Sequence, residues 1–442
     1  MNLPSPLLSS TEPITEAEFA QSMTKLGPFE PHPYLAVAVS GGSDSLALAL
    51  LANQWIKNHA GSLIALTVDH QLRPTSTQEA HQVQQWLSGY GINTIILTWA
   101  EEKSGRRLQE KAREARYQKL EEWCRDQGVL HLLLGHHLED QLETVSMRAE
   151  KGSGIEGMAG MSALVEKPYH RLLRPLLLYT KSRLQATLIS SHQPWIEDPS
   201  NQNPKFKRVE LRSKTSNFSS SEIHSFGQKR CAYEEALNRL IPEIVTPLPQ
   251  GYAFLNYQAW SQLDLESQLG VMQRLLMTYG VNSYPPAGES VHKLILHFQK
   301  ASSSRTLNGC RISRYREKNL LFMREPGAIR HEIDLSNAAN TAPLFWDQRF
   351  SVHLSSPLHG QHTLKALGQK GWESVKKALE DQKELLPYPV ALTLPSLWQQ
   401  DQLIAIPSVF KICSNQTFTL FKENAIKFLP CYPLTRFTFT IA

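Results

Sequence analysis

From Tyr34 onward, short apolar runs alternate with longer amphipathic stretches, and no other feature constrains the fold more. The runs LAVAVS, LIALTV, TIILTW and HLLLG are predominantly apolar and do not alternate with polar residues, which indicates strands buried on both faces. Helical patterns follow them at about residues 45–59, 77–87, 106–126 and 138–149. Apolar strands separated by helices predict an α/β fold built on a doubly wound, Rossmann-like parallel sheet.

Polar residues directly follow several of these strands. SGGSDS, residues 40–45, follows the first run, Asp69 and His70 follow the second, and Gly135 to His137 follow the fourth. Ligands of open parallel sheets bind beyond the carboxyl ends of the strands. We therefore expect these residues to lie at one edge of the sheet and to form a single site.

The SGGSDS stretch has the features of a phosphate-binding loop between a strand and a helix. Gly41 and Gly42 permit a tight turn whose N–H groups face one point, and the following helix N-terminus adds positive potential. Asp44 would repel phosphate unless a divalent cation joined the two, so we expect Mg²⁺ there. The alternative is a turn that only caps a helix. The hydroxyl groups that can donate to phosphate oxygens are those of Ser40, Ser43 and Ser45.

Length and composition limit the class of protein. A chain of 442 residues is expected to form two or three domains. Its net charge of +5 permits a nucleic-acid partner without requiring one. The five cysteines are scattered without a CxxC pair, which is typical of a reducing compartment. No signal-peptide pattern and no apolar run of about 20 residues occurs, so we expect a cytoplasmic protein.

The composition changes twice along the chain, which predicts three domains. Residues 201–230 are polar and rich in Ser, Lys and Arg, as in a loop that borders the site and continues into a linker. A second break spans residues 326–343. We assign a catalytic domain to 1–220, a mainly helical domain to 230–325 and a small α+β domain to 343–442. The expected elements are helices at 233–240, 259–279, 290–299 and 372–385, a hairpin at 311–323, and strands at 349–354, 403–406, 418–421 and 436–441.

Several motifs carry a resemblance to a known family. SGGSDS resembles the SGGxDS loop of the N-type ATP pyrophosphatases, the PP-loop superfamily. The stretches VDHQLR, KAREARYQKL, GHHLEDQLETVSMRAEKGSGIEGMAGM and WIEDPSNQNPKFKRVELR are similar, in the same order, to motifs of the bacterial tRNA(Ile)-lysidine synthases. The resemblance is dense from Tyr34 to about Arg212. Beyond Arg212 the chain agrees with the family only in outline.

The resemblance implies an ATP-dependent ligase that modifies an isoleucine tRNA with a CAU anticodon. ATP would adenylate the C2 oxygen of the wobble cytidine, with pyrophosphate as the leaving group. The ε-amine of free lysine would then attack C2 and expel AMP, which yields lysidine. ATP, Mg²⁺, lysine and tRNA are therefore the expected ligands, and a homodimer is a further expectation.

The resemblance also implies roles at the HHLED stretch. Asp140 is expected to hold the ammonium group of substrate lysine, with His136 beside it at the reacting cytosine. His136, Asp140, Glu143 and Met147 are spaced to share one face of a helix, so His136 and Asp140 would point from its first turn into the cleft. The alternatives are a solvated ion pair and a zinc site. Adjacent histidines at a helix start rarely face one metal ion.

Further residues are expected to contact ATP or tRNA. Asp69 is a candidate for the ribose of ATP, and the alternative is an acid that caps the next segment. Arg208, in KFKRVELR, is expected to neutralise charge on the α-phosphate. A solvated helix face is the alternative for the helical basic residues. The expected tRNA-binding residues are Arg113, Arg116, Lys205, Lys207, Arg212, Lys376 and Lys377.

Other functions are compatible with the PP-loop. A tRNA thiolase shares the adenylation step but usually needs reactive cysteines or an iron–sulfur cluster, and this chain has no CxxC pair. A non-catalytic RNA- or nucleotide-binding protein would not need the complete SGGSDS loop together with Asp140. An amidotransferase-linked ligase would need an N-terminal cysteine nucleophile, which is absent.

Overall fold

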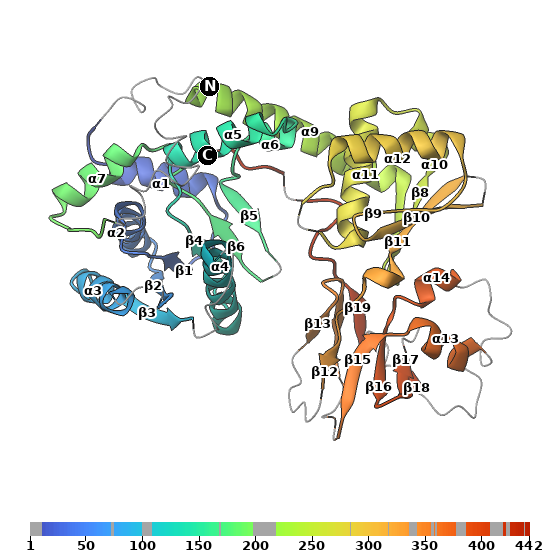
Figure 1. Cartoon of the computed structure of the whole chain (residues 1–442). Coiled ribbons are helices and arrows are strands. Elements are labelled where there is room, and N and C mark those ends of the chain that lie inside the picture. Colours follow the sequence, from blue (N-terminus) through green and yellow to red (C-terminus); the bar gives the residue numbers. More distant parts are fainter. Residues whose placement is uncertain are drawn as a thin grey trace. The chain divides into compact units, whose positions relative to one another are not determined.

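The chain forms two compact units in the computed structural model (Figure 1). One unit comprises Met1–Glu234 and Phe437–Ala442, and the other comprises Glu235–Arg436. The three domains expected from the sequence stay a prediction.

In the part of the chain that the structure describes, no helix has the length and apolar character needed to cross a membrane. The described residues are 11–71, 75–99, 108–167, 169–197, 218–282, 284–316, 318–335, 343–354, 358, 360–376, 386–406, 419–420, 425–436 and 438–442.

The first unit contains the expected sheet, with strand order β3-β2-β1-β4-β6-β5. Every neighbouring pair is parallel except β5 with β6. The predicted α/β fold class is confirmed. Strands β5 and β6 are missing from the prediction, because three-residue segments that end or begin with a charged residue, LVE and RLL, do not stand out as apolar runs. The strands are β1 (Tyr34–Ala38), β2 (Ser62–Asp69), β3 (Asn93–Thr98), β4 (His131–Leu133), β5 (Leu164–Glu166) and β6 (Arg171–Leu173).

Helices connect these strands, and the four helices predicted between residues 45 and 149 begin and end within two residues of those observed. The prediction that residues 201–230 form a loop and linker is wrong for the part beyond Ser219. A capping box starts a helix there, in which Ser219 Oγ accepts from Glu222 N and Glu222 Oε2 accepts from Ser219 N, at 3.3 and 2.7 Å. The helices are α1 (Glu16–Lys25), α2 (Ser43–Lys57), α3 (Ser76–Ser88), α4 (Leu108–Gln127), α5 (Leu138–Glu150), α6 (Ile155–Met158), α7 (Lys181–Ser190) and α9 (Ser220–Ile244).

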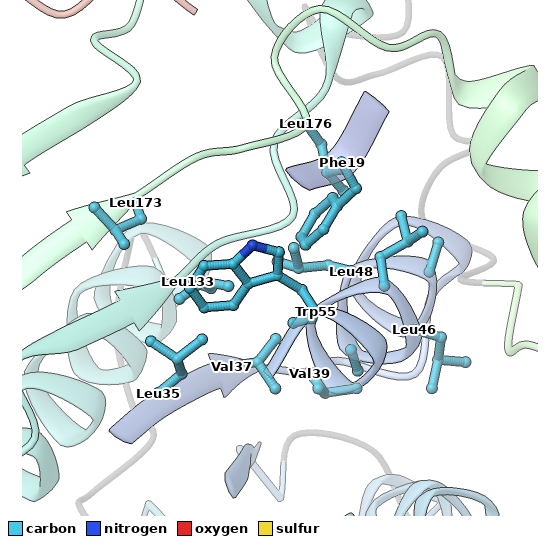
Figure 2. Packing of buried hydrophobic residues seen from close by; sticks show 14 of the residues in the cluster. Phe19, Leu35, Val37, Val39, Leu46, Leu48, Trp55, Leu133, Leu173 and Leu176 are labelled. Carbon is cyan, nitrogen blue, oxygen red and sulfur yellow. The ribbon is translucent and has the colours of Figure 1, made fainter. Parts of the chain in front are cut away.

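Apolar side chains cover both faces of the central strand β1. Leu35 and Val37 belong to one core cluster, whereas Ala36 belongs to the cluster on the opposite face. Figure 2 shows the indole of Trp55 among the first of these clusters, close to Val37 and Leu133. Burial on both faces explains why the strand reads as an unbroken apolar run. It also leaves only the ends of the strands for polar chemistry.

The second unit contains sheets whose described strand pairs are antiparallel, except that β17 pairs with β18 in parallel. The predicted hairpin at 311–323 is confirmed as β10 and β11, within a sheet of order β7-β8-β11-β10-β9. The single helix predicted at 259–279 is two helices, because Asp264 caps a new one by accepting from Ser267 N at 2.9 Å. The elements are α10 (Tyr257–Ser261), α11 (Leu265–Gly280), α12 (Gly288–Lys300), β7 (Val245–Leu248), β8 (Tyr252–Asn256), β9 (Arg305–Leu307), β10 (Cys310–Tyr315) and β11 (Asn319–Arg324).

The remainder of this unit contains a five-stranded sheet of order β12-β15-β16-β17-β18 and a three-stranded sheet of order β13-β14-β19. The strand predicted at 436–441 is wrong, since the described residues 436 and 438–442 lie outside any strand. The elements are β12 (Ile333–Asp334), β13 (Leu344–Trp346), β14 (Phe350–Val352), β15 (His362–Ala366), α13 (Gly368–Lys376), α14 (Tyr388–Ala391), β16 (Pro395–Gln399), β17 (Gln402–Ile406), β18 (Thr419–Leu420) and β19 (Ile426–Phe428).

Candidate active site

A cavity of about 610 Å³ lies at the carboxyl ends of β1, β2 and β4. It has the size expected of a site for a nucleotide-sized ligand. The strand ends named from the sequence therefore do converge on one site. The polar or glycine residues that line the cavity include Ser40, Gly42, Asp44, Ser45, His70, Ser76, Glu79, Arg116, Tyr117, Gly135 and His136.

The SGGSDS loop joins β1 to α2 and is held by its own hydroxyl groups. Ser40 N donates to Ser45 Oγ at 3.1 Å, and Ser45 Oγ donates to the Gly42 carbonyl oxygen at 3.1 Å. Ser43 Oγ donates to Asp44 Oδ1 at 2.9 Å. These bonds fix the turn in which α2 begins at Ser43 with Gly42 as its N-cap. The helix N-terminus therefore faces the cavity, as anion binding requires.

Gly41 is needed for both its conformation and its size. Its φ is +86°, and a Cβ there would lie 2.9 Å from Val83 Cγ2 and 2.9 Å from Ile196 Cδ1. The Gly41 carbonyl oxygen also accepts from Ile196 N at 2.8 Å. The loop thus packs against two other segments and has no space for a side chain.

Gly41→Ala is expected to destabilise the protein and to weaken ATP binding. The left-handed backbone costs about 1–2 kcal/mol for a residue with a Cβ, and the contacts with Val83 and Ile196 add to that cost. Gly128→Ala is a matched control, because Gly128 has a φ of +65° but no atom near its Cβ position. Urea unfolding and ATP titration should show the larger loss in Gly41→Ala, and a loss of ATP affinity in that variant alone. Equal effects on stability would show that packing around the loop is unimportant.

His137, to which the sequence analysis gave no role, joins the carboxylates of the site. Its Nε2 lies 3.5 Å from Asp44 Oδ2 and 3.5 Å from Asp140 Oδ2, and its Nδ1 lies 2.8 Å from Glu139 Oε2. Its backbone N donates to Asp140 Oδ2 at 3.1 Å. The side chain is buried. One histidine therefore links the loop acid with the acid expected to bind lysine.

The surroundings of His137 favour its protonated form. Burial by itself would lower the pKa of His137, but its contacts with Asp44 and Glu139 and the charge of Asp140 raise the pKa to about 9. Burial likewise opposes ionisation of Asp44, yet His137, Lys181 and Ser43 hold the pKa of Asp44 below its usual value. The ring nitrogens of His137 thus face carboxylates. Among the described residues, no three or more His, Cys, Asp and Glu side chains are grouped to hold a metal ion.

His137→Gln is expected to lower stability in a pH-dependent way. The folded-state pKa of about 9 exceeds the ordinary value of 6.5, so the stabilisation is fully present below pH 6.5 and is lost as the pH rises through 9. The free energy of unfolding of the ligand-free protein should therefore differ from that of His137→Gln by up to about 3 kcal/mol near pH 6, and by little above about pH 9.5. The exposed His81→Gln on α3 is the control. A constant difference across this range would contradict the assignment.

His136 lies in the loop between β4 and α5, so its predicted place in the first turn of the helix is wrong. It nevertheless lines the cavity, as expected. Its Nδ1 accepts a hydrogen bond from Arg174 Nε at 3.2 Å. Burial, followed by the charges of Arg174, Arg113 and Arg116, lowers the pKa of His136 to about 3. His136 is therefore neutral at physiological pH.

The remaining described candidates differ in position. Both carboxylate oxygens of Asp69 accept hydrogen bonds, from Ser76 Oγ at 2.8 Å and Thr77 Oγ1 at 2.7 Å. This fits the alternative of an acid that caps the next segment. The contact of Asp69 with the ribose of ATP stays a prediction. Arg116 lines the cavity, whereas Arg113, on the same helix, is exposed.

Of the other expected site residues, Lys376 is described by the structure and five lie outside the described residues. Lys376 is exposed at the end of α13, in the second unit. Its contact with tRNA stays a prediction. The candidates that lie outside the described residues are Lys205, Lys207, Arg208, Arg212 and Lys377.

Comparison with known proteins gives a consistent family. A family model described as a PP-loop domain matches residues 12–217. The tRNA(Ile)-lysidine synthase of Orientia tsutsugamushi is 30% identical over 91% of this chain and 95% of its own length, and that of Wolbachia pipientis wMel is 32% identical over 85% and 88%. Among solved structures, the U34-tRNA thiolase NcsA from Methanococcus maripaludis with its [4Fe-4S] cluster has a TM-score of 0.41 and 18% identity, over 48% of this chain and 76% of that one. With similarity over most of its length and a complete PP-loop at the cavity, the chain belongs to the tRNA(Ile)-lysidine synthase family of PP-loop ATP pyrophosphatases.

Proposed function

We propose that this ATP-dependent ligase adenylates the wobble cytidine of an isoleucine tRNA with a CAU anticodon and then joins free lysine to it. The observation that carries the proposal is the position of His137 between Asp44 and Asp140, 3.5 Å from each carboxylate. The PP-loop supplies Asp44, and the helix after β4 supplies Asp140. In this proposal, a nucleotide site and a site for a cationic amine therefore adjoin each other.

In the first step, the C2 oxygen of cytosine attacks the α-phosphorus of ATP. A bond forms between this oxygen and phosphorus, the bond to the bridging oxygen breaks, and pyrophosphate leaves. The N-terminus of α2 and the hydroxyl groups of Ser40, Ser43 and Ser45 bind the pyrophosphate oxygens in this proposal. The chain needs no lysine in the loop, because the group it stabilises is the leaving pyrophosphate.

Asp44 is the proposed ligand of Mg²⁺. Its carboxylate lines the cavity and has 27% of its side-chain surface exposed, so a cation bound to phosphate oxygens can reach it. Carboxylate and phosphate oxygens are the ligands that Mg²⁺ prefers. When bound, Mg²⁺ neutralises charge on the phosphates. His137 holds Asp44 in place and, being positive, offsets its charge until the nucleotide arrives.

In the second step, the ε-amine of lysine attacks C2 of the adenylated base. A C–N bond forms, the C2–O bond breaks, AMP leaves with that oxygen, and the amine releases a proton. Asp140 is the proposed partner of the lysine ammonium group before reaction. Its Oδ2 accepts from the backbone N–H of His137 at 3.1 Å, which orients the carboxylate, and 24% of the side chain is exposed, so a cationic ligand can reach it.

The thiolase alternative has weaker support. Cys124 lies within α4 with none of its surface exposed, and burial raises its pKa to about 12. A thiol with this pKa does not supply the thiolate that sulfur transfer requires. Burial raises the pKa of Cys310 to about 12 as well.

Incorporation of radiolabelled lysine into tRNA tests the proposal. The substrate is an isoleucine tRNA transcript with a CAU anticodon, supplied with ATP and Mg²⁺, and the control transcript carries U in place of the wobble C. Label in the first transcript alone is the expected result. Release of pyrophosphate without lysine incorporation would support the adenylation step and would contradict lysine as the nucleophile. Neither signal from folded protein would favour a binding protein. Light scattering of the same preparation tests the expected homodimer. The cytoplasmic location stays a prediction.

A further inference from the structure

The last described residues return to the first unit and lead by a chain of contacts to His136. We call residues 438–442 the returning tail. Thr440 N donates to Ser162 Oγ at 3.0 Å, and the Thr440 carbonyl oxygen accepts from Ala163 N at 2.9 Å. Phe439 is buried, and its N donates to Glu234 Oε2 at 2.7 Å. The tail is thus held at Phe439 and at both backbone groups of Thr440.

Ser162 and Ala163 connect the returning tail to Arg174. Their carbonyl oxygens both accept from Arg174: Ser162 from the guanidinium Nη1 and Ala163 from the backbone N, each at 2.8 Å. Toward the tail, the same two residues use other groups, namely the Ser162 hydroxyl and the Ala163 N–H. This short segment therefore lies between Thr440 and Arg174 and is bonded to each of them.

The bond from Arg174 to His136 determines where the imidazole carries its proton. A guanidinium group is only a hydrogen-bond donor, so His136 Nδ1 must accept from Arg174 Nε with a lone pair. A neutral ring whose Nδ1 accepts has its proton on Nε2. Since His136 lines the cavity, Nε2–H is the polar group left to contact a ligand.

We propose that Arg174 is a positioning residue that fixes His136 as the Nε2–H tautomer, and that the returning tail holds Arg174 in place through Ser162 and Ala163. The inference rests on the proposed function. With its proton on Nε2, His136 would donate a hydrogen bond to an oxygen of ATP or of the base. This tautomer excludes His136 as the general base for the lysine amine. The charged or titratable groups that act on His136 come from three segments: Arg174 after β6, Arg113 and Arg116 on α4, and the adjacent His137.

The tautomer can be read directly by long-range ¹H–¹⁵N NMR of protein labelled at histidine, with His136→Asn used to assign the signal. We expect the Nε2–H pattern in the unaltered chain and a shift toward a tautomer mixture in Arg174→Gln. The kcat of Arg174→Gln should fall about tenfold to a hundredfold, because the variant loses a group that orients a functional histidine. Its KM for ATP should stay within about threefold of that of the unaltered chain. Arg125→Gln, an exposed change on α4, is the control.

A second pair of variants tests the tail without altering Arg174. Thr440→Pro removes the N–H that donates to Ser162 Oγ, whereas Thr440→Ala keeps the backbone groups. We expect the tautomer shift in the proline variant alone. An unchanged Nε2–H pattern in Arg174→Gln, or identical spectra for the two Thr440 variants, would overturn the proposal. Should Arg174→Gln fail to fold, the Thr440 pair decides. The spectra need no substrate, so a failed lysine assay would refute the proposed function separately.

Discussion

Asp44→Asn is expected to lower the rate of tRNA-dependent pyrophosphate release by about two to three orders of magnitude. The amide retains the shape of the side chain but loses the negative charge that would hold Mg²⁺ against the phosphates. Loss of one preorganised electrostatic group that acts on the developing charge typically costs a factor of 10² to 10³, or about 3–4 kcal/mol. Release of labelled pyrophosphate from ATP, measured with saturating tRNA, gives the rate directly.

The control for Asp44→Asn is Asp126→Asn, an equal change of charge on the exposed part of α4. Its rate should equal that of the unaltered chain. Urea unfolding of both variants distinguishes loss of chemistry from loss of the fold, because Asp44 also contacts His137 and Ser43. Pyrophosphate release at a normal rate from folded Asp44→Asn would show that the loop carboxylate takes no part in adenylation.

Asp140→Asn is expected to raise the KM for lysine by about 30-fold to 150-fold while changing the KM for ATP by less than about threefold. Removal of one partner of a desolvated, hydrogen-bonded charge pair costs at least 2–3 kcal/mol, which corresponds to this range. Asparagine still accepts a hydrogen bond from His137 N, so the start of α5 is preserved. Lysine incorporation at varied lysine and at varied ATP separates the two constants.

Glu150→Gln, an exposed acid at the other end of α5, is the matched control for Asp140→Asn and should leave both constants unchanged. The comparison also tests the link through His137. If the KM values for lysine and ATP rose together in Asp140→Asn, this acid would act on the PP-loop through His137, and the assignment of a lysine pocket would be wrong.

Local sequence patterns were sufficient to predict the parallel sheet and the edge of it at which ligands bind. The apolar run before Ser40, the glycines that follow and the amphipathic stretch from α2 onward each lie within one segment of chain. Periodicity, turn chemistry and helix capping are properties of neighbouring residues, so they can be recognised without the fold. For this reason the positions of the PP-loop and of His136 at the cavity were predictable.

The start of α9 is an intermediate case. Its capping box, formed by Ser219 and Glu222, is a local signal that was present in the sequence. The prediction failed because the many Ser, Lys and Arg residues of the preceding segment are also typical of a linker. Composition averaged over a long window obscured a signal that occupies four residues.

Only the tertiary structure decided how the site is assembled. His137 contacts Asp44 from a different strand end, Arg174 reaches His136 across 38 residues of sequence, and Thr440 reaches Ser162 across 278. The pairing of such distant groups depends on strand order and chain reversal, about which local patterns carry no information. The sequence by itself determined which residue types stand at the ends of the strands. The fold decided which of them share a proton or a hydrogen bond, because those contacts exist only once the sheet has brought its strand ends together.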